Sequence, residues 1–330
     1  MKTVDNLLTA ITVIIPVLNE EKNLPRCLDA VVRQKYRPGG IKIMIADGGS
    51  KDNTAGIARS YGCRVINNHY KLAEPGIALA MESAETDLCC ILAADNIISE
   101  ADDFFLKMAL PFQHDNTAAA LPAVISKKDE PYINQYINYR AEPFSEFLYG
   151  NACNTRTFHK VYTEIKRTDD YVIYDFSSGD YPLIALAQGM IVNRRVLTRT
   201  AKSAYCDMQP VIQLLEQKSA VALVHSAELY HYQIMSTRIF IKKFQWRIRN
   251  NLIQPKTPGI NTRKDFTRKK YLWFVYSLTF ILPLLSSVVS IITHRKVFFI
   301  YRFITNQLIL LLLPYTYLKV KSGTARETYK

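Results

Sequence analysis

Residues 41–54 read IKIMIADGGSKDNT, and this segment predicts the fold class. Its first part, 41–46, is a mostly apolar run that fits a buried strand, and two glycines follow it. Asp52 or Asn53 then stands where the N-cap of a helix through Arg59 is expected. A strand that leads directly into a helix predicts one βα unit of a parallel sheet.

The same rhythm runs through the N-terminal part of the chain. Residues 11–17 are a continuous apolar run, and apolar residues then recur on one helical face of 24–32. Further strands are predicted over 63–67 and 88–93, with a helix over 76–84 between them. Repeated βα units of this size predict a right-handed, doubly wound sheet, which binds ligands at the carboxyl ends of its strands.

Polar side chains follow four of these predicted strands. They stand in segments 16–20, 47–54, 71–76 and 93–96. A carboxylate at a strand end can accept a hydrogen bond from a nucleobase or a ribose, and one beside a diphosphate can hold a divalent cation. Alone, the second segment also fits a turn and the fourth a helix cap. Their order and spacing together favour a nucleotide site.

In this order the segments resemble the family 2 glycosyltransferases. IIPVLNEE, residues 14–21, resembles the family's opening strand and turn, and ADGGSKDNT, 46–54, resembles its second signature. ILAADN, 91–96, resembles its DxD strand end. The resemblance covers about residues 10–250. It implies the GT-A fold, an α/β fold with a Rossmann-like mixed sheet, and a glycosyltransferase that uses Mg²⁺ or Mn²⁺.

The resemblance also implies a donor site for a nucleotide diphosphate sugar at these strand ends. Asp47 would contact the nucleobase and Asp95 would ligate the metal, whereas Ala93 replaces the first aspartate of the DxD motif. His231 is a second candidate metal ligand, although a lone histidine is as often structural. The other donor-site candidates are Pro16, Val17, Asn19, Glu20, Gly49, Lys71, Gly76, Ala94 and Arg238.

A catalytic base is expected further along the chain. QGMIVNRR, residues 188–195, resembles the family strand beside the acceptor, and CDMQP, 206–210, stands where the family has an ED-type motif. Asp207 is therefore the predicted base, with Asp180 as the competitor, and both also fit helix caps. The tyrosine-rich region 126–175 would shape the acceptor site or belong to the core. The resemblance implies one displacement with inversion at the anomeric carbon.

The C-terminal part is predicted to form a membrane hairpin of two transmembrane helices. Residues 272–293 carry no charge and are long enough to span a bilayer. Residues 297–318 are as long, but Arg302 and two amide side chains interrupt them, so a re-entrant segment is the alternative. Basic residues before the first segment predict a catalytic domain, within residues 1–260, on the cytoplasmic side of the cell membrane.

Charge and spacing set the expected parts and partners. The net charge is +13, and a basic stretch borders the apolar segments, which favours anionic lipid or a diphosphate over nucleic acid. The predicted partners are the donor, a lipid-linked or glycan acceptor, and membrane lipid. The expected parts are a nucleotide-sugar-binding half (1–125), an acceptor-binding half (126–235), a basic amphipathic helix with linker (236–270) and the hairpin with its tail (271–330).

Two other classes fit parts of the pattern. A non-catalytic membrane protein that binds sugar nucleotides is consistent with Ala93 and with Cys206, which replaces the family's usual glutamate. A membrane-anchored nucleotidyltransferase would release pyrophosphate, although the basic, glycine-rich opening loop expected of that class is missing. Release of a nucleoside diphosphate from the donor distinguishes the three classes.

Overall fold

The chain forms two compact units. The structure is a computed structural model, and it describes residues 9–37, 39–114, 116–176, 182–183, 187–195, 219–249 and 267–324. Unit 1 comprises residues 1–125, 158–180 and 184–231. Unit 2 comprises residues 126–157, 181–183 and 232–330.

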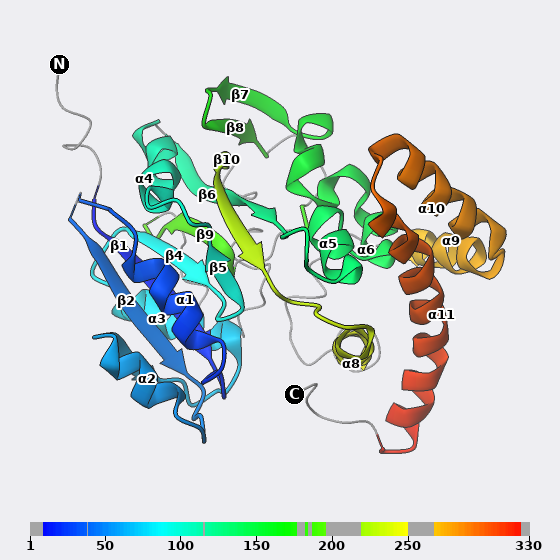
Figure 1. Ribbon diagram of the computed structural model, residues 1–330, viewed down its shortest axis with the longest axis horizontal. Helices are drawn as coiled ribbons and strands as arrows, with labels where there is room; N and C mark the ends of the chain where they lie inside the picture. The colour runs from blue at the N-terminus through cyan, green and yellow to red at the C-terminus, as the bar shows by residue number, and fades with distance from the viewer. Residues whose placement is uncertain are drawn as a thin grey trace. The chain divides into compact units, whose positions relative to one another are not determined.

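Unit 1 is built on one mixed sheet (Figure 1). The strand order is β3-β2-β1-β4-β9-β6-β10-β8-β7, and β5 pairs with β10. The neighbours β1 to β4 are parallel, whereas β9 runs antiparallel to both β4 and β6. The strands are β1 Ile11–Val17, β2 Ile41–Asp47, β3 Arg64–Asn67, β4 Leu88–Leu92, β5 Asn96–Ile98, β6 Thr117–Ile125, β7 Thr163–Arg167, β8 Tyr171–Asp175, β9 Gln188–Asn193 and β10 Ala220–His231. The predicted mixed α/β sheet is confirmed.

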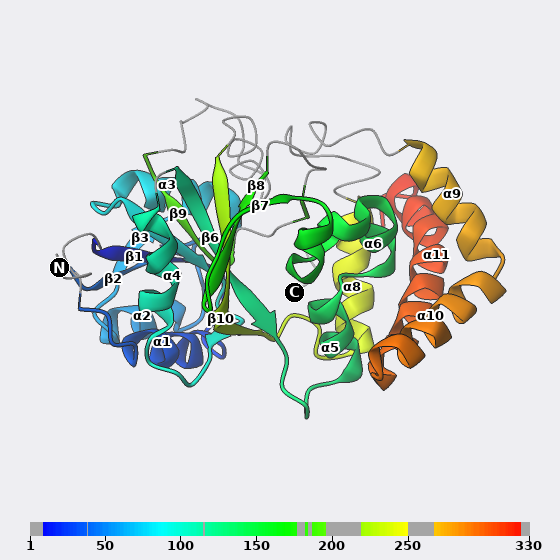
Figure 2. The same cartoon turned by 90° about the horizontal axis from the view of Figure 1, so that it is seen from above.

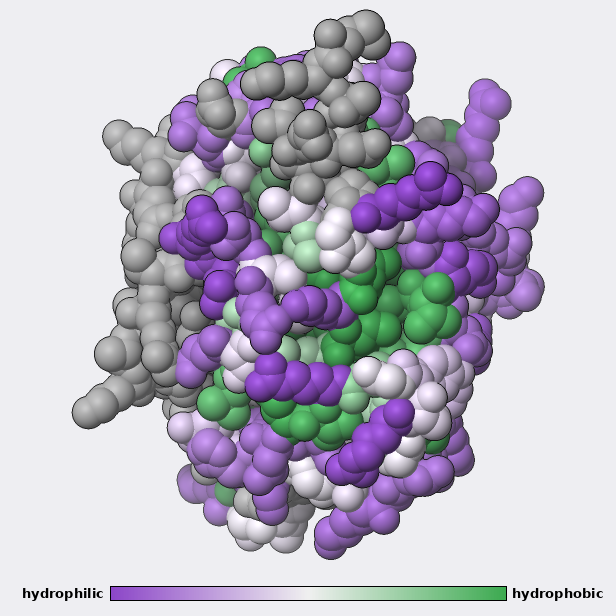
Figure 3. Space-filling view, turned by 90° about the vertical axis from the view of Figure 1, so that its left-hand side faces the viewer, coloured by the Kyte–Doolittle hydropathy of each residue, from purple (hydrophilic) through white to green (hydrophobic). Residues whose placement is uncertain are grey.

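Helices cover both faces of the β1–β4 part of this sheet, with α1 and α3 on opposite faces (Figures 1 and 2). The helices of unit 1 are α1 Leu24–Val32, α2 Thr54–Ser60, α3 Ala73–Ser83, α4 Phe104–Ala109 and the 3-10 helix η2 Leu110–Gln113. Because α1 packs on alternate residues of β1 and α3 packs on β1 and β2, side chains on both faces of β1 are buried. That explains the continuous apolar run of β1 in the sequence. One face of the molecule also carries a patch of hydrophobic side chains among hydrophilic ones, as folded proteins commonly do (Figure 3).

The strand register brings the predicted ligand-binding segments to one edge of the sheet. Val17 pairs with Asp47, and Asp47 pairs with Asn67 on the next strand. On the other side of β1, Ile14 pairs with Ile91 of β4. The loops that follow these parallel strands therefore leave the sheet at the same edge, as the sequence predicts.

Unit 2 is helical. Its helices are α5 Tyr132–Tyr139, α6 Pro143–Tyr149, α8 Thr237–Arg247, α9 Thr267–Leu278, α10 Ile281–His294 and α11 Ile300–Lys321, with short 3-10 helices η3 Gly150–Cys153, η4 Thr155–Lys160 (which ends in unit 1) and η7 Val297–Phe299. One buried cluster joins Ile133 of α5, Phe240 of α8, Trp273 of α9 and Ile309 of α11. The C-terminal helices therefore complete the core of unit 2.

The two apolar segments of the predicted hairpin differ from expectation. A single straight helix over 272–293 is wrong, because α9 and α10 meet at an angle of 89°. Pro283 explains the break, since it has no N–H for the Thr279 carbonyl and its ring would clash with that carbonyl in a continuous helix. The segment Val297–Lys321 is instead the one helix among the described residues that is long and apolar enough to cross a membrane, or one of two if the bent pair counts as a span.

Candidate functional site

The loops that follow β1 and β2 are tied to each other by hydrogen bonds. The Asn19 backbone N–H donates to Ser50 Oγ at 2.9 Å, and the Lys51 N–H donates to Asn19 Oδ1 at 2.8 Å. The Glu20 N–H donates to Thr54 Oγ1 at 2.8 Å. Asn19 adopts a φ of 55°, which asparagine tolerates better than most residues. The two loops therefore form one rigid platform at the edge of the sheet.

Asp47 stands at the end of β2 with half of its carboxylate engaged. Its Oδ1 accepts from the Ser50 backbone N–H at 3.0 Å and from Ser50 Oγ at 2.6 Å. Among the described residues, Oδ2 has no hydrogen-bond partner. Val17 is buried in the core, so only its backbone remains for a ligand, whereas Pro16 is half-buried. Gly49 has a φ of 83°, which lets the chain turn away directly after the strand.

Asp52 holds the start of α2. Its Oδ1 accepts from the Thr54 backbone N–H at 3.1 Å, and its Oδ2 accepts from the Glu21 N–H at 3.2 Å. Burial opposes ionisation, but the hydrogen bonds from Thr54 outweigh it and lower the pKa of Asp52. Of the two predicted caps, Asp52 supplies the side chain, since Asn53 makes no side-chain cap bond.

Lys71 and Gly76 lie in and after the β3–α3 loop. Lys71 is exposed and has a φ of 58°. Gly76 is buried, and a Cβ there would lie 2.6 Å from Nδ2 of Asn68. That amide donates to the Leu72 carbonyl at 2.7 Å. Gly76 therefore makes room for Asn68, which in turn fixes the loop.

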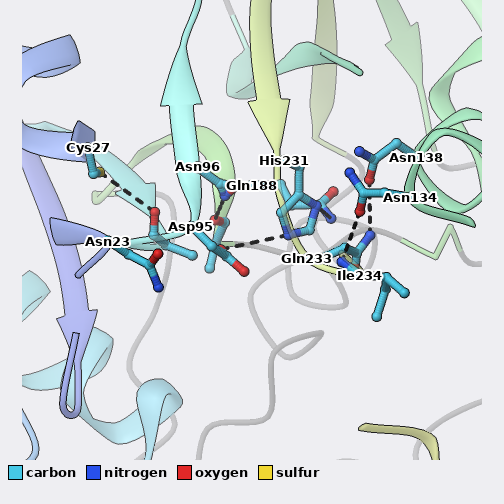
Figure 4. Close-up of polar contacts among 12 residues, drawn as sticks. Asn23, Cys27, Asp95, Asn96, Asn134, Asn138, Gln188, His231, Gln233 and Ile234 are labelled. Atoms are coloured by element: carbon cyan, nitrogen blue, oxygen red, sulfur yellow. Dashed lines mark hydrogen bonds and ion pairs between the residues drawn. The ribbon is translucent and has the colours of Figure 1, made fainter. Parts of the chain in front are cut away.

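The end of β4 brings Asp95 to His231, which lies more than a hundred residues later in the chain. The antiparallel pair of β5 and β10 sets Asn96 opposite His231, and Asp95 directly precedes β5. His231 Nε2 lies 3.8 Å from Asp95 Oδ1, and His231 Nδ1 lies 3.1 Å from the Gln188 amide nitrogen (Figure 4). The His231 side chain is 8% exposed. Two of the predicted metal ligands therefore converge.

Hydrogen bonds to the Ala187 carbonyl fix the loop that carries Asp95. The Ala93 N–H donates to the Ala187 carbonyl at 2.9 Å, and Asn96 Nδ2 donates to the same carbonyl at 3.2 Å. Cys27 Sγ lies 3.7 Å from the Ala93 carbonyl (Figure 4). Burial, and after it the Asp95 carboxylate, raise the pKa of the Cys27 thiol, which therefore stays neutral. Ala94 is buried and contributes no side chain to a ligand.

Asp95 and His231 fit a divalent cation that a substrate helps to coordinate. Within the described ranges there is no group of three or more His, Cys, Asp or Glu side chains that could hold a metal ion. Mg²⁺ is commonly bound through one or two carboxylates together with substrate phosphates, and Mn²⁺ sites also accept carboxylate ligands. One carboxylate and one imidazole match that arrangement and do not make a complete protein site.

Three other predicted site residues lie in unit 2 or outside the described residues. Arg238 is exposed near the start of α8, in unit 2. Asp180 and Asp207 lie outside the described residues. The contact of Gln188 with His231 was not predicted from the sequence. Gln188 begins β9 and His231 ends β10, and their spacing in the sequence does not show that these two strand ends lie together.

Unit 1 has the architecture of a GT-A domain. Its mixed sheet carries the hydrogen-bonded loops after β1 and β2 and, after β4, Asp95 beside His231. Residues 12–175 match the family model described as glycosyl transferase family 2, and the chain belongs to this family. The resemblance stated from the motifs is confirmed.

Individual glycosyltransferases match short parts of the chain. Glycosyltransferase AglE of Haloferax volcanii is 43% identical over 57 residues, 17% of this chain and 19% of that protein. The 4,4'-diaponeurosporenoate glycosyltransferase of Staphylococcus aureus is 38% identical over 58 residues, 18% of this chain and 15% of that protein. The chain thus matches less than a fifth of the length of each.

A solved structure covers more of the chain. The mannosyltransferase PcManGT from Pyrobaculum calidifontis, in complex with GDP-Man and Mn²⁺, superposes with a TM-score of 0.53 at 14% identity. The match covers 94% of this chain and 87% of that one. At this identity the likeness shows a shared fold.

Proposed function

We propose that the protein transfers a glycosyl group from a nucleotide diphosphate sugar to a hydroxyl or phosphate acceptor, with inversion at the anomeric carbon. The observation that carries this proposal is the convergence of Asp95 and His231 beside the platform formed by the β1 and β2 loops. The Oδ2 of Asp47, which has no hydrogen-bond partner among the described residues, would accept from a nucleobase. Membership of glycosyl transferase family 2 supports the reaction class.

Asp95 and His231 would hold Mg²⁺ or Mn²⁺. When bound, the cation would neutralise charge on the departing nucleoside diphosphate. Gln188 has both an amide donor and an amide acceptor, so it can serve either tautomer of the imidazole. With its oxygen toward Nδ1–H, the imidazole would present its Nε2 lone pair on the side of Asp95. The Pyrobaculum mannosyltransferase forms a complex with GDP-Man and Mn²⁺, which supports metal use here.

Asp207 is the proposed base that takes the proton from the acceptor hydroxyl, and Asp180 is its competitor. Replacing the base with asparagine should lower the rate about 10²–10⁴-fold, because the amide cannot take that proton. Parallel kinetics of Asp207→Asn and Asp180→Asn assign the role to the variant with the large loss.

We propose that the acceptor is a lipid-linked or glycan molecule and that the protein works on the cytoplasmic side of the cell membrane. Exposed apolar side chains are concentrated on α9 and α10, where Val275, Val289 and Ile292 are 61%, 60% and 71% exposed. Lys270 in the first turn of α9 and Arg295 directly after α10 are exposed and complement anionic lipid. Apolar side chains are also exposed on another face of the molecule (Figure 3). The membrane contact is therefore supported by the high density of exposed apolar side chains on α9 and α10 together with their basic neighbours.

A double substitution, Val289→Lys with Ile292→Lys, tests membrane binding. We expect it to reduce flotation with vesicles that contain anionic lipid, because two lysines replace apolar contacts on the surface. Leu72→Lys, at an exposed apolar site in unit 1, is the matched control and should leave flotation unchanged. Truncation at residue 260 would be uninformative, since it removes Trp273 and Ile309 from the core of unit 2. Equal flotation of all three proteins would remove α10 from the membrane contact.

Transfer itself is tested by incubating membranes that contain the full chain with a panel of labelled nucleotide sugars and Mn²⁺. We expect release of a nucleoside diphosphate and a labelled product in the lipid or glycan fraction. Release of pyrophosphate would instead identify a nucleotidyltransferase. Donor binding without any release would identify a non-catalytic sugar-nucleotide-binding protein.

A further inference from the structure

Unit 2 contains a cavity of about 250 Å³ that none of the proposed donor-site residues lines. It lies among α6, α9 and α11, whereas the donor-site strand ends belong to unit 1. Its wall includes Arg140, Glu146, Phe147, Asn151, Tyr276 and Arg302.

Glu146 is the most informative group in this wall. Its side chain is 6% exposed, and Oε1 accepts from Arg140 Nη2 at 2.7 Å and lies 3.3 Å from Arg302 Nη2. Oε2 is buried and has no hydrogen-bond partner among the described residues. Since a buried carboxylate oxygen without a donor is destabilising, the wall lacks a donor at this point.

The two arginines supply the opposite polarity. Arg140 donates to Glu146 through Nε and Nη2, and Arg302 donates through Nη1 to Ser290 Oγ at 2.7 Å. A guanidinium carries five N–H groups, so the contacts with described residues leave donors on both side chains. The cavity therefore offers a buried acceptor beside several donors.

Two aromatic rings complete the wall. The centroids of Phe147 and Tyr276 are 5.5 Å apart, and their planes are inclined by 34°. Ligand sites commonly combine such apolar surfaces with a few placed polar groups. Here the rings stand beside the Arg–Glu–Arg cluster.

We propose that this cavity binds an uncharged sugar ring. A sugar hydroxyl both donates and accepts, so neighbouring hydroxyls can serve the Glu146 carboxylate and the arginines together. An inorganic phosphate or a lipid phosphate offers mainly acceptors, so it could serve the two arginines but not the Glu146 carboxylate. We assign this sugar ring to the acceptor, and that assignment rests on the proposed transferase function. The binding of a sugar ring in the cavity does not depend on that function.

The test uses the full chain in a detergent without a sugar headgroup, and it contains no nucleotide. Methyl glycosides of glucose, galactose, mannose and N-acetylglucosamine are titrated by saturation-transfer NMR, with inorganic phosphate as the competing probe. For a ligand of this size we expect a Kd of about 1 mM for the preferred glycoside. Octyl β-D-glucopyranoside below its micellar concentration is the second arm.

Two variants examine the wall. Glu146→Gln turns the carboxylate into an amide, so one acceptor oxygen and the negative charge that pairs with the arginines are lost. We expect this change to weaken glycoside binding about 10-fold or more. Because Glu146→Gln also disturbs an ion pair, Asn151→Trp fills the cavity from its exposed rim without removing that pair. Lys128→Trp, at an exposed position of unit 2 outside the wall, is the matched control. Thermal unfolding verifies that each variant is folded.

Saturable glycoside binding that both cavity variants weaken and Lys128→Trp retains supports the proposal. Similar affinity for the methyl and octyl forms indicates a glycan source, and tighter octyl binding that Glu146→Gln still weakens indicates a glycolipid source. Failure to bind any glycoside, binding unaffected by Asn151→Trp, or displacement by phosphate overturns it. Any of those results leaves the transfer assay unaffected, because donor and turnover are absent here.

Discussion

Two ends of the same sheet edge use their polar groups differently. In the loops after β1 and β2, Asn19, Ser50 and Asp52 satisfy backbone groups of the neighbouring loop. After β4, Asp95 and His231 only approach each other, at 3.8 Å, and the buried Oδ1 of Asn96 has no partner among the described residues. We expect Asn19, Ser50 and Asp52 to act as a scaffold, and Asp95 and His231 to bind a ligand or a cation. Substitutions in the two regions should therefore affect different quantities.

The largest effect is expected at Asp95. Asp95→Asn removes the negative charge at the end of β4 and should lower turnover by about 10²–10³-fold, because it weakens charge stabilisation at the departing diphosphate. Little change in stability is expected, since the side chain is partly exposed. Steady-state kinetics over a range of Mn²⁺ concentrations, with chemical denaturation, measure both quantities.

Asp87→Asn is the matched control for Asp95. Asp87 lies just before the opposite end of β4 and pairs with the exposed Arg195 at 2.7 Å. Such exposed pairs contribute little, so this variant should retain activity. If both variants kept full activity with metal present, the β4 end would not be the reacting region.

A smaller effect is expected at His231, the second proposed metal ligand, and at its partner Gln188. His231→Gln should raise the Mn²⁺ concentration for half-maximal activity about 10–100-fold. Gln188→Leu leaves the imidazole but removes its partner, so its shift should have the same direction and be smaller. Metal titrations of activity measure both. An unchanged metal requirement in His231→Gln would assign the histidine a structural role.

The smallest effects belong to the scaffold. Asn19→Ala loses the acceptor for the Lys51 N–H and places alanine at a positive φ, so it should destabilise unit 1 by about 1–3 kcal/mol. Asn19→Gly loses only the hydrogen bond and should cost less. Urea denaturation compares them. A stability loss as large in Asn19→Gly as in Asn19→Ala would show that the backbone conformation is not the cause.

The same difference explains what the sequence could predict. Continuous apolar runs and adjacent turn residues predicted the strands through β4 and the Asp47 loop, because those signals are local. Pro283 is a local signal for the break between α9 and α10, but the lack of charge favoured a single span, so the break was not predicted. Gln188 and His231 meet only through the pairing of distant strands, and Arg302 reaches Glu146 through helix packing. Neither contact has a local signal.

We propose that Asp95 couples the binding of a divalent cation to the binding of a nucleoside diphosphate. Calorimetric titration of UDP and GDP into the wild-type chain and into Asp95→Asn, with and without Mn²⁺, measures that coupling directly. For the nucleotide that binds, we expect Mn²⁺ to tighten wild-type affinity by about 10-fold or more and to have little effect on Asp95→Asn, a coupling of about 1.4 kcal/mol. An equal effect of Mn²⁺ on both proteins would contradict the claim.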